Sequence, residues 1–336
     1  MMEPDAGDLE GLELERATLG LINMVAYSAS SRAHARDFAA ATGVALPTSD
    51  IRLLEYLSGR GDVPTSTVAH DLGIDLSQAS RRSRQLSDAG YVVRGADPSD
   101  LRRTLLRLSP VGVTLLDEWL LAWSTGYRDV STEWTSSDQL ALEHWFRRVR
   151  DVLVEALPDR PASAVPDRWL ALTEQDALGP QHRALTATAV GLVSWVGQSG
   201  GFNDLLEAQG VPLRQHAFFT LRVVSHHGPL SVAEVAERLG TDHSQASKRL
   251  SRLVDLGLAD RAVDSFDRRS SLVRVSKRGA AVERRVRDAQ LEGFADILGE
   301  IGPADRTRWT ALTRRYVTGL FAAHSRPHLD VMPGPR

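Results

Sequence analysis

Residues 72–81 read LGIDLSQASR, and residues 239–248 read LGTDHSQASK. In both stretches a glycine, which suits a sharp turn, stands two positions before an aspartate. An aspartate there can accept hydrogen bonds from the free N–H groups at the start of a helix. Two short helices joined by a tight turn that holds a glycine are typical of a helix-turn-helix. Each stretch therefore predicts the turn of such a motif and the start of its second helix.

Both stretches lie within an internal repeat that has an offset of 167 residues. Residues 43–112 align with residues 210–279 without a gap, and 27 of the 70 aligned pairs are identical. Self-similarity at a fixed offset indicates a repeated structural unit. We therefore expect one repeat over residues 1–157, a proline-rich linker over residues 158–167, and a second repeat over residues 168–336.

A strand-forming pattern follows each helix-turn-helix. Residues 91–94 and 104–108 predict the two strands of a hairpin, because the segment between them is rich in turn-forming residues. Residues 258–262 and 271–275 predict the same hairpin in the second repeat. A helix-turn-helix followed by such a hairpin is a winged helix.

Long helical patterns flank the two winged helices. They are predicted at residues 12–41, 110–130, 137–157, 276–299 and 303–324. Their apolar faces, which include Trp119 and Trp309, need a partner, since burial of each such side chain contributes roughly 1.5–3 kcal/mol. We expect the helices of the two repeats to pack together as a helical dimerisation region. The predicted fold class is mainly α with small β wings: a duplicated winged helix-turn-helix with pseudo-two-fold symmetry.

The order and spacing of these motifs resemble those of the multiple antibiotic resistance regulator (MarR) family. In the first repeat the resemblance is carried by Leu72, Gly73, Asp75, Ser77, Ala79, Ser80, Leu86, Gly90, Asp97, Asp100, Arg102, Ser109 and Gly112. The second repeat resembles the family's wing motif and the start of the following helix at Asp264, Asp267, Arg268, Arg269, Ser276 and Gly279. The first wing departs from the pattern because Leu101 separates Asp100 from Arg102.

The resemblance implies a sequence-specific DNA-binding transcriptional regulator, more often a repressor than an activator. Members of the family are typically homodimers, so the repeat implies two protomers fused into one single-chain pseudo-dimer, with further dimerisation left open. Two recognition helices of different sequence would read an imperfect palindrome. Double-stranded DNA is the expected partner.

The charge distribution favours DNA binding independently of the resemblance. The whole chain has a net charge of -3. Residues 73–112 carry seven Arg against four Asp (+3), and residues 240–279 carry nine Lys and Arg against five Asp (+4), which leaves -10 on the rest. A basic surface on an acidic body is the electrostatic pattern of a phosphate-binding face.

The candidate DNA-binding residues lie on the second helix of each motif and on the wings. They are Ser77, Gln78, Ser80, Arg81, Arg82, Arg84, Arg102, Arg103, Ser244, Gln245, Ser247, Lys248, Arg249, Arg252, Arg268 and Arg269. The glutamines suit adenine, and Arg81 and Lys248 suit guanine. Arg82 and Arg249 are expected to contact phosphates, and the wing arginines suit phosphates or narrow minor grooves.

The resemblance also implies a small aromatic or anionic effector, bound between the dimerisation helices and the winged helix. Candidate wall residues are Tyr27, His34, Trp119, Trp195, His216 and Phe218. A place in the core remains the alternative for each of them. The chain has no Cys, which excludes disulfides, thiolate metal sites and peroxide sensing through a thiol.

The sequence holds no nucleotide-binding glycine loop, nucleophile elbow or zinc-protease motif. We therefore expect no enzyme activity, no cofactor and no metal site. The longest apolar runs fall far short of the ~18 residues of a membrane span, so we expect a cytoplasmic protein without membrane contact. A winged-helix scaffold that binds a protein partner, without specific DNA recognition, remains the alternative function.

Overall fold

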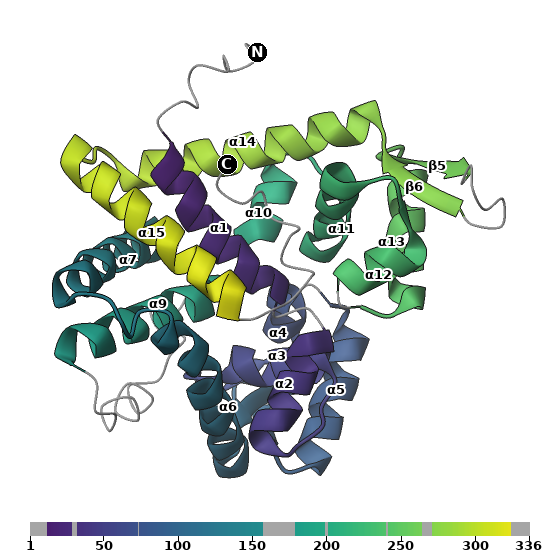
Figure 1. Cartoon of the computed structure of the whole chain (residues 1–336). Helices are drawn as coiled ribbons and strands as arrows, with labels where there is room; N and C mark the ends of the chain where they lie inside the picture. Colours follow the sequence, from purple (N-terminus) through teal and green to yellow (C-terminus); the bar gives the residue numbers. More distant parts are fainter. Residues whose placement is uncertain are drawn as a thin grey trace. The chain divides into compact units, whose positions relative to one another are not determined.

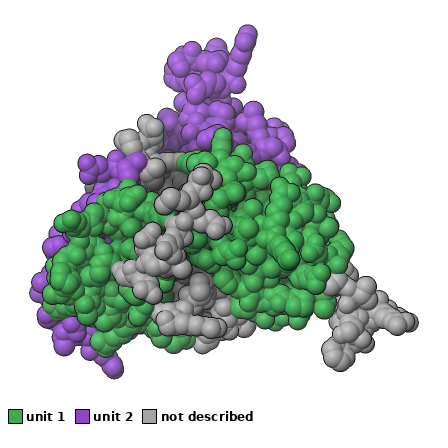
Figure 2. Space-filling model, turned by 90° about the horizontal axis from the view of Figure 1, so that it is seen from above, with its two compact units in different colours: residues 1–32, 201–336 green, residues 33–200 purple. Residues whose placement is uncertain are grey.

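The computed structural model describes residues 12–28, 32–72, 74–156, 179–198, 201–239, 241–263 and 271–323. The chain divides into two compact units (Figure 2). Unit 1 consists of Met1–Arg32 and Gly201–Arg336, and unit 2 consists of Ala33–Gly200. Figure 1 labels the helices of both units and the strands β5 and β6.

Unit 2 contains a helix-turn-helix, a small sheet and a group of longer helices. Its elements are α2 (Arg32–Thr42), α3 (Thr48–Leu57), β1 (Val63–Pro64), α4 (Thr65–Leu72), α5 (Leu76–Asp88), β2 (Val92–Asp97), β3 (Asp100–Leu108), α6 (Pro110–Asp129), α7 (Ser136–Ala156) and α9 (Pro180–Gln198). The sheet is antiparallel, with the strand order β1-β3-β2.

From α10 to α15, unit 1 contains the same kinds of element, in the same order, as unit 2 from α2 to α7. Its elements are α1 (Glu13–Ser28), α10 (Gly201–Ala208), α11 (Gln215–His227), β4 (Leu230–Ser231), α12 (Val232–Arg238), α13 (His243–Asp255), β5 (Ala259–Val263), β6 (Ser271–Val275), α14 (Lys277–Leu298) and α15 (Pro303–Ala323). Its sheet is antiparallel with the order β4-β6-β5, the counterpart of the order in unit 2.

A serine joins each wing to the helix that follows it. In unit 2, the Ser109 hydroxyl donates to the Gly90 carbonyl at 2.5 Å and accepts from the Gly112 N–H at 3.0 Å. Ser276 makes the corresponding two bonds in unit 1, at 2.8 and 2.9 Å. A Cβ on Gly112 would lie 2.1 Å from the Tyr91 carbonyl oxygen, so only glycine fits at this crossing.

The helical layer of each unit is completed by a helix from the other sequence repeat. In unit 1, α1 packs against α14 and α15, and Glu15 pairs with Arg306 at 2.8 Å. In unit 2, α9 packs against α6 and α7, and Thr188 donates to Glu143 at 3.1 Å. The compact units therefore differ from the repeats 1–157 and 168–336 by an exchange of N-terminal helices, and the repeat bounds remain a prediction.

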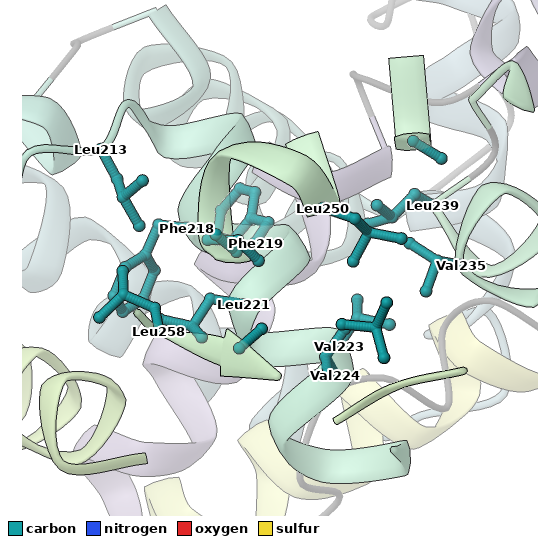
Figure 3. Packing of buried hydrophobic residues seen from close by; sticks show 14 of the residues in the cluster. Leu213, Phe218, Phe219, Leu221, Val223, Val224, Val235, Leu239, Leu250 and Leu258 are labelled. Carbon is teal, nitrogen blue, oxygen red and sulfur yellow. The ribbon is translucent and has the colours of Figure 1, made fainter. Parts of the chain in front are cut away.

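The second helix of the helix-turn-helix in unit 1, α13, is fixed by an apolar cluster that joins it to α11 and the sheet. Leu250 of α13 belongs to this cluster together with Phe218 and Leu221 of α11 (Figure 3). Ala246 and Leu253 complete the buried face of α13. With one face anchored in this way, the opposite face of the helix is directed to solvent.

Two sequence predictions need correction or completion. Within the segment 12–41, where one helix is predicted, the structure describes two helices, α1 ending at Ser28 and α2 beginning at Arg32, and residues 29–31 between them lie outside the described residues. The two-residue strands β1 and β4 escape prediction, because two residues show no alternation.

The structure agrees with the predicted class of a mainly helical fold with small antiparallel sheets. Among the described residues, none of the helices combines the length and the apolar character that crossing a bilayer requires.

Candidate nucleic-acid interface

The first recognition helix, α5, begins at an aspartate cap. Asp75 accepts from the Ser77 hydroxyl at 2.5 Å, from the Gln78 N–H at 2.7 Å and from the Gln78 side-chain amide at 2.5 Å. The hydrogen bond from Ser77, followed by those from Gln78, holds the pKa of Asp75 below its usual value. The carboxylate therefore stays ionised and stabilises the N-terminus of the helix, where the helix dipole is positive.

The second recognition helix, α13, has the same cap and a different arrangement of its glutamine. Asp242 accepts from the Ser244 hydroxyl at 2.9 Å and from the Gln245 N–H at 2.7 Å. The side-chain carbonyl of Gln245, however, accepts from Arg249 at 3.2 Å and from Thr241 at 3.3 Å. Gln78 thus offers its amide to a carboxylate, whereas Gln245 offers its carbonyl to a guanidinium.

The predicted DNA-binding residues separate from the core residues as the sequence suggests. Ala79 and Leu86 on α5, and Ala246 and Leu253 on α13, are buried. The exposed candidates are Ser77, Arg81, Arg84, Arg102, Arg103, Ser244, Gln245, Lys248 and Arg252. The half-buried candidates are Gln78, Ser80, Arg82, Ser247 and Arg249. Arg268 and Arg269 lie outside the described residues.

Arg82 is the candidate whose surroundings the sequence did not reveal. Its guanidinium donates to Asp50 of α3 at 2.8 Å and also to Ser49. This ion pair joins α5 to α3 and is partly shielded from solvent, since the Asp50 side chain is only 9% exposed. The residue aligned with Asp50 in the second repeat is Ala217, which cannot form the same pair. The phosphate contact expected of Arg82 remains a prediction.

The tip of the first wing is held by two aspartates. Asp97 accepts from the Ser99 N–H at 2.8 Å and from its hydroxyl at 2.6 Å, and it lies 3.6 Å from the Arg103 guanidinium. These hydrogen bonds from Ser99, with a smaller effect of Arg103, lower the pKa of Asp97. Asp100 accepts from the Arg102 N–H at 3.0 Å. The side chains of both wing arginines are therefore presented by a fixed backbone.

Two of the candidate effector residues meet in unit 2. Glu55 Oε1 lies 3.1 Å from His34 Nε2 and accepts from the Trp119 indole N–H at 2.9 Å. The His34 and Trp119 rings are edge to face, with centroids 5.0 Å apart. Burial alone would raise the pKa of Glu55, but His34, Trp119 and Arg52 more than offset this effect and the pKa is lowered.

The described part of the structure does not show the remaining effector candidates in one site. The side chains of Tyr27 and Trp195 lie outside the described residues. His216 is half-buried on α11, and Phe218 on the same helix is fully buried. Glu55 gives no signal in the sequence, because a carboxylate in an amphipathic helix ordinarily marks its solvated face.

A buried charged cluster in unit 1 was also missed. Arg222 of α11 is 4% exposed, and its Nε lies 3.4 Å from Glu283 Oε1 of α14, which is 2% exposed. Glu283 also pairs with Arg287 at 3.3 Å and lies 3.9 Å from His226. The Arg222 guanidinium lies 5.3 Å from the Phe218 ring centroid.

The hydrogen bonding of this cluster is incomplete. Among the described residues, Arg222 Nε and Nη2 have no hydrogen-bond acceptor, and Glu283 Oε1 has no donor. Burial lowers the pKa of Arg222, an effect that Glu283 opposes. In the aligned repeats, Arg222 stands where unit 2 has Glu55, so equivalent helices carry charges of opposite sign at this position, Arg222 buried and Glu55 half-buried. No group of three His, Cys, Asp or Glu side chains suited to a metal ion occurs within the described ranges.

Comparisons with known proteins find a family whose model is similar to part of the second repeat. Residues 209–270 match the model of the MarR family. Over 86 residues the chain is 28% identical to the uncharacterized HTH-type transcriptional regulator YfiV of Bacillus subtilis (strain 168). The aligned segment covers 26% of this chain and 54% of the relative. The chain thus spans about half the length of this curated relative.

Two solved structures are also similar over part of the chain. RV1404 from Mycobacterium tuberculosis is 30% identical, with 37% of this chain and 82% of that chain covered and a TM-score of 0.32. CouR from Rhodococcus jostii RHA1, bound to p-coumaroyl-CoA, is 26% identical, with 28% and 65% covered and a TM-score of 0.25.

Proposed function

We propose that the chain, whose residues 209–270 match the MarR family model, is a sequence-specific DNA-binding transcriptional regulator that acts as a repressor. The observation that carries the proposal is the pair of recognition helices α5 and α13. Each begins at an aspartate cap, continues with the sequence Ser-Gln-Ala-Ser, buries its alanine and exposes basic side chains. Polar and basic groups at the start of a second helix are what base readout in the major groove requires.

We further propose that the two units act as a single-chain pseudo-dimer on an imperfect palindrome. The gapless repeat, the matching element order and the matching sheet order support a duplicated winged helix. In such a pair, half-sites are centred about one turn of DNA apart, roughly 10 base pairs. The half-sites would differ because the recognition helices differ. Arg81 is aligned with Lys248 in the sequence, and the side chains of Gln78 and Gln245 have different hydrogen-bond partners.

A small aromatic or anionic effector would modulate DNA binding. In unit 1 this proposal is supported by the buried Arg222, whose guanidinium lies close to an aromatic ring and whose Nη2 has no hydrogen-bond acceptor among the described residues, a geometry that suits a carboxylate. In unit 2 the corresponding cluster holds a carboxylate, Glu55, with His34 and Trp119. Because the two clusters differ in charge, the two units would not bind the same effector equally well.

Fluorescence anisotropy with the full chain tests the proposed function. The probes are duplex DNA from the region upstream of its own gene and random duplex DNA of the same length, at two salt concentrations. A regulator of this kind binds its operator about 10³-fold or more tightly than random DNA, and its affinity falls steeply with salt. Equal and weak binding to both probes would contradict the proposal and favour a scaffold that binds protein.

Matched variants then test the asymmetry. Gln78→Ala is expected to relax base preference in one half-site, and Gln245→Ala in the other. If both variants relaxed the same half-site, or both half-sites equally, the model of two unlike half-sites would be wrong.

A further inference from the structure

Unit 2 exposes two large apolar side chains on elements that a winged helix directs to DNA. Leu76, 56% exposed, is the first residue of the recognition helix α5, and Leu101, 81% exposed, lies in β3 beside the tip of the wing. The other strongly exposed large apolar residues within the described ranges all lie on the long helices, at Val111, Leu121, Leu140 and Ile297. Leu101 has the largest exposed fraction of this set.

The aligned positions of the other repeat hold residues of different chemistry. His243, which is exposed, stands at the first position of α13 where α5 has Leu76. Arg268 is aligned with Leu101 in the sequence. The same two positions are therefore apolar in the first repeat and polar or basic in the second.

The backbone around both leucines is fixed by other residues. Leu76 directly follows the cap residue Asp75, whose hydrogen bonds define the first turn of α5. Leu101 follows a two-residue turn that Asp97 braces through Ser99, and Asp100 binds the next backbone N–H. Neither leucine side chain is needed for these bonds, so the local fold does not explain why they are apolar.

The charges around Leu101 distinguish DNA from an apolar protein partner. Arg102 and Arg103 follow it directly, and both are exposed. Guanidinium groups on the wing suit the phosphates that border a minor groove. A leucine among such groups matches the side chains that proteins insert between base steps of the minor groove, which open a kink there.

We propose that Leu76 and Leu101 make apolar contacts with DNA that the other half of the chain does not make. Leu76 packs against the methyl group of a thymine in the major groove, a contact that apolar side chains make there. Leu101 inserts at a pyrimidine–purine step in the adjacent minor groove, since such steps unstack most easily. The inference rests on the proposed function and specifies which bases one half-site contains.

Selection of bound duplexes from a random DNA library by the full chain gives the probe for the test. We expect a motif whose two halves differ, with a fixed thymine in the half read by unit 2. If no motif is enriched, the proposed function fails and this inference fails with it. If the enriched motif has two identical halves, the proposed function stands and only this inference is overturned.

The thymine contact is tested by replacing the fixed thymine with deoxyuridine, which removes only the methyl group. Loss of one buried methyl corresponds to a roughly 4-fold weaker affinity for the unmodified chain. Leu76→Ala should bind both probes equally, and His243→Ala, the matched control, should retain the 4-fold difference. Equal sensitivity to deoxyuridine in the unmodified chain and in Leu76→Ala would overturn the assignment.

The minor-groove contact is tested with duplexes labelled at both ends, whose energy transfer reports DNA bending. We expect Leu101→Ala to reduce the bend and to weaken binding about 5- to 10-fold, since an inserted leucine buries most of its side chain. Leu101→Arg, which introduces the residue of the other wing, should steepen the salt dependence by about one unit without restoring the bend. An unchanged bend in both variants, with circular dichroism showing intact folding, would overturn the role of Leu101.

Discussion

Replacing Glu283 with glutamine removes one negative charge from the buried cluster of α11 and α14 and almost preserves the shape of the side chain. The Glu283 side chain is 2% exposed and the Arg222 side chain 5%. In the described part of the chain, Arg222 Nε and Nη2 have no hydrogen-bond acceptor, so the nearby carboxylate is the main compensation for the guanidinium charge. Removing one partner of a buried ion pair costs about 3–5 kcal/mol, because the other charge stays buried. We expect Glu283→Gln to lower the free energy of unfolding by about that amount.

Urea denaturation followed by far-ultraviolet circular dichroism measures this effect. With a denaturant dependence of about 3 kcal/mol per M, the transition midpoint should fall by roughly 1–2 M. Arg287→Ala is the matched control, because Arg287 contacts the same carboxylate but its side chain is 40% exposed. An exposed partner of this kind contributes less than about 1 kcal/mol. A midpoint for Glu283→Gln no lower than that of the control would refute the reasoning.

Three further predictions address the wings and the recognition helix. Gly112→Ala and Gly279→Ala should each strongly lower the melting temperature, because the new Cβ would lie 2.1 and 1.9 Å from a backbone carbonyl oxygen. Arg82→Ala should lower the melting temperature, because it removes the ion pair with Asp50, and should reduce the salt slope of DNA binding by about one, because Arg82 is expected to contact a phosphate. Arg81→Ala, by contrast, should relax the preference for one base at a cost of about 1–3 kcal/mol, because Arg81 is expected to read guanine. Asp97 has a lowered pKa, so its stabilising effect is present above the unfolded value near 4 and is lost as the pH falls through the folded value. Asp97→Asn should therefore have a lower melting temperature than the unmodified chain at pH 7, and the two should converge near pH 2; a constant difference would contradict this.

The local elements of the fold follow closely from the sequence. The cap positions Asp75 and Asp242 and the strand Ser271–Val275 are confirmed, because each depends on residues close together in the chain. Capping, turn formation and helical spacing are short-range effects.

The missed features depend on residues far apart in the chain. The sequence predicts that helices of the two repeats pack together, as α1 and α9 do, but an amphipathic helix shows only that one face is buried and not which side chains cover it. The same holds for Glu55 and Arg222. In the sequence both look like solvent-exposed charges, and only the fold shows that Trp119 contacts Glu55 and that Glu283 contacts Arg222. Chemistry that depends on burial by a distant partner leaves no mark in a local pattern.

The exchange of α1 and α9 also has a consequence for synthesis on the ribosome. The partners of α1 in unit 1, α14 and α15, begin at Lys277 and Pro303. At about 5–20 residues per second, α1 emerges roughly 15–50 s before the helices that cover its apolar face. Unit 2, whose last helix ends at Gln198, can be complete well before that time. The nascent chain therefore completes unit 2 before unit 1. The apolar face of α1 stays uncovered for the longest time and is accessible to chaperones during that time.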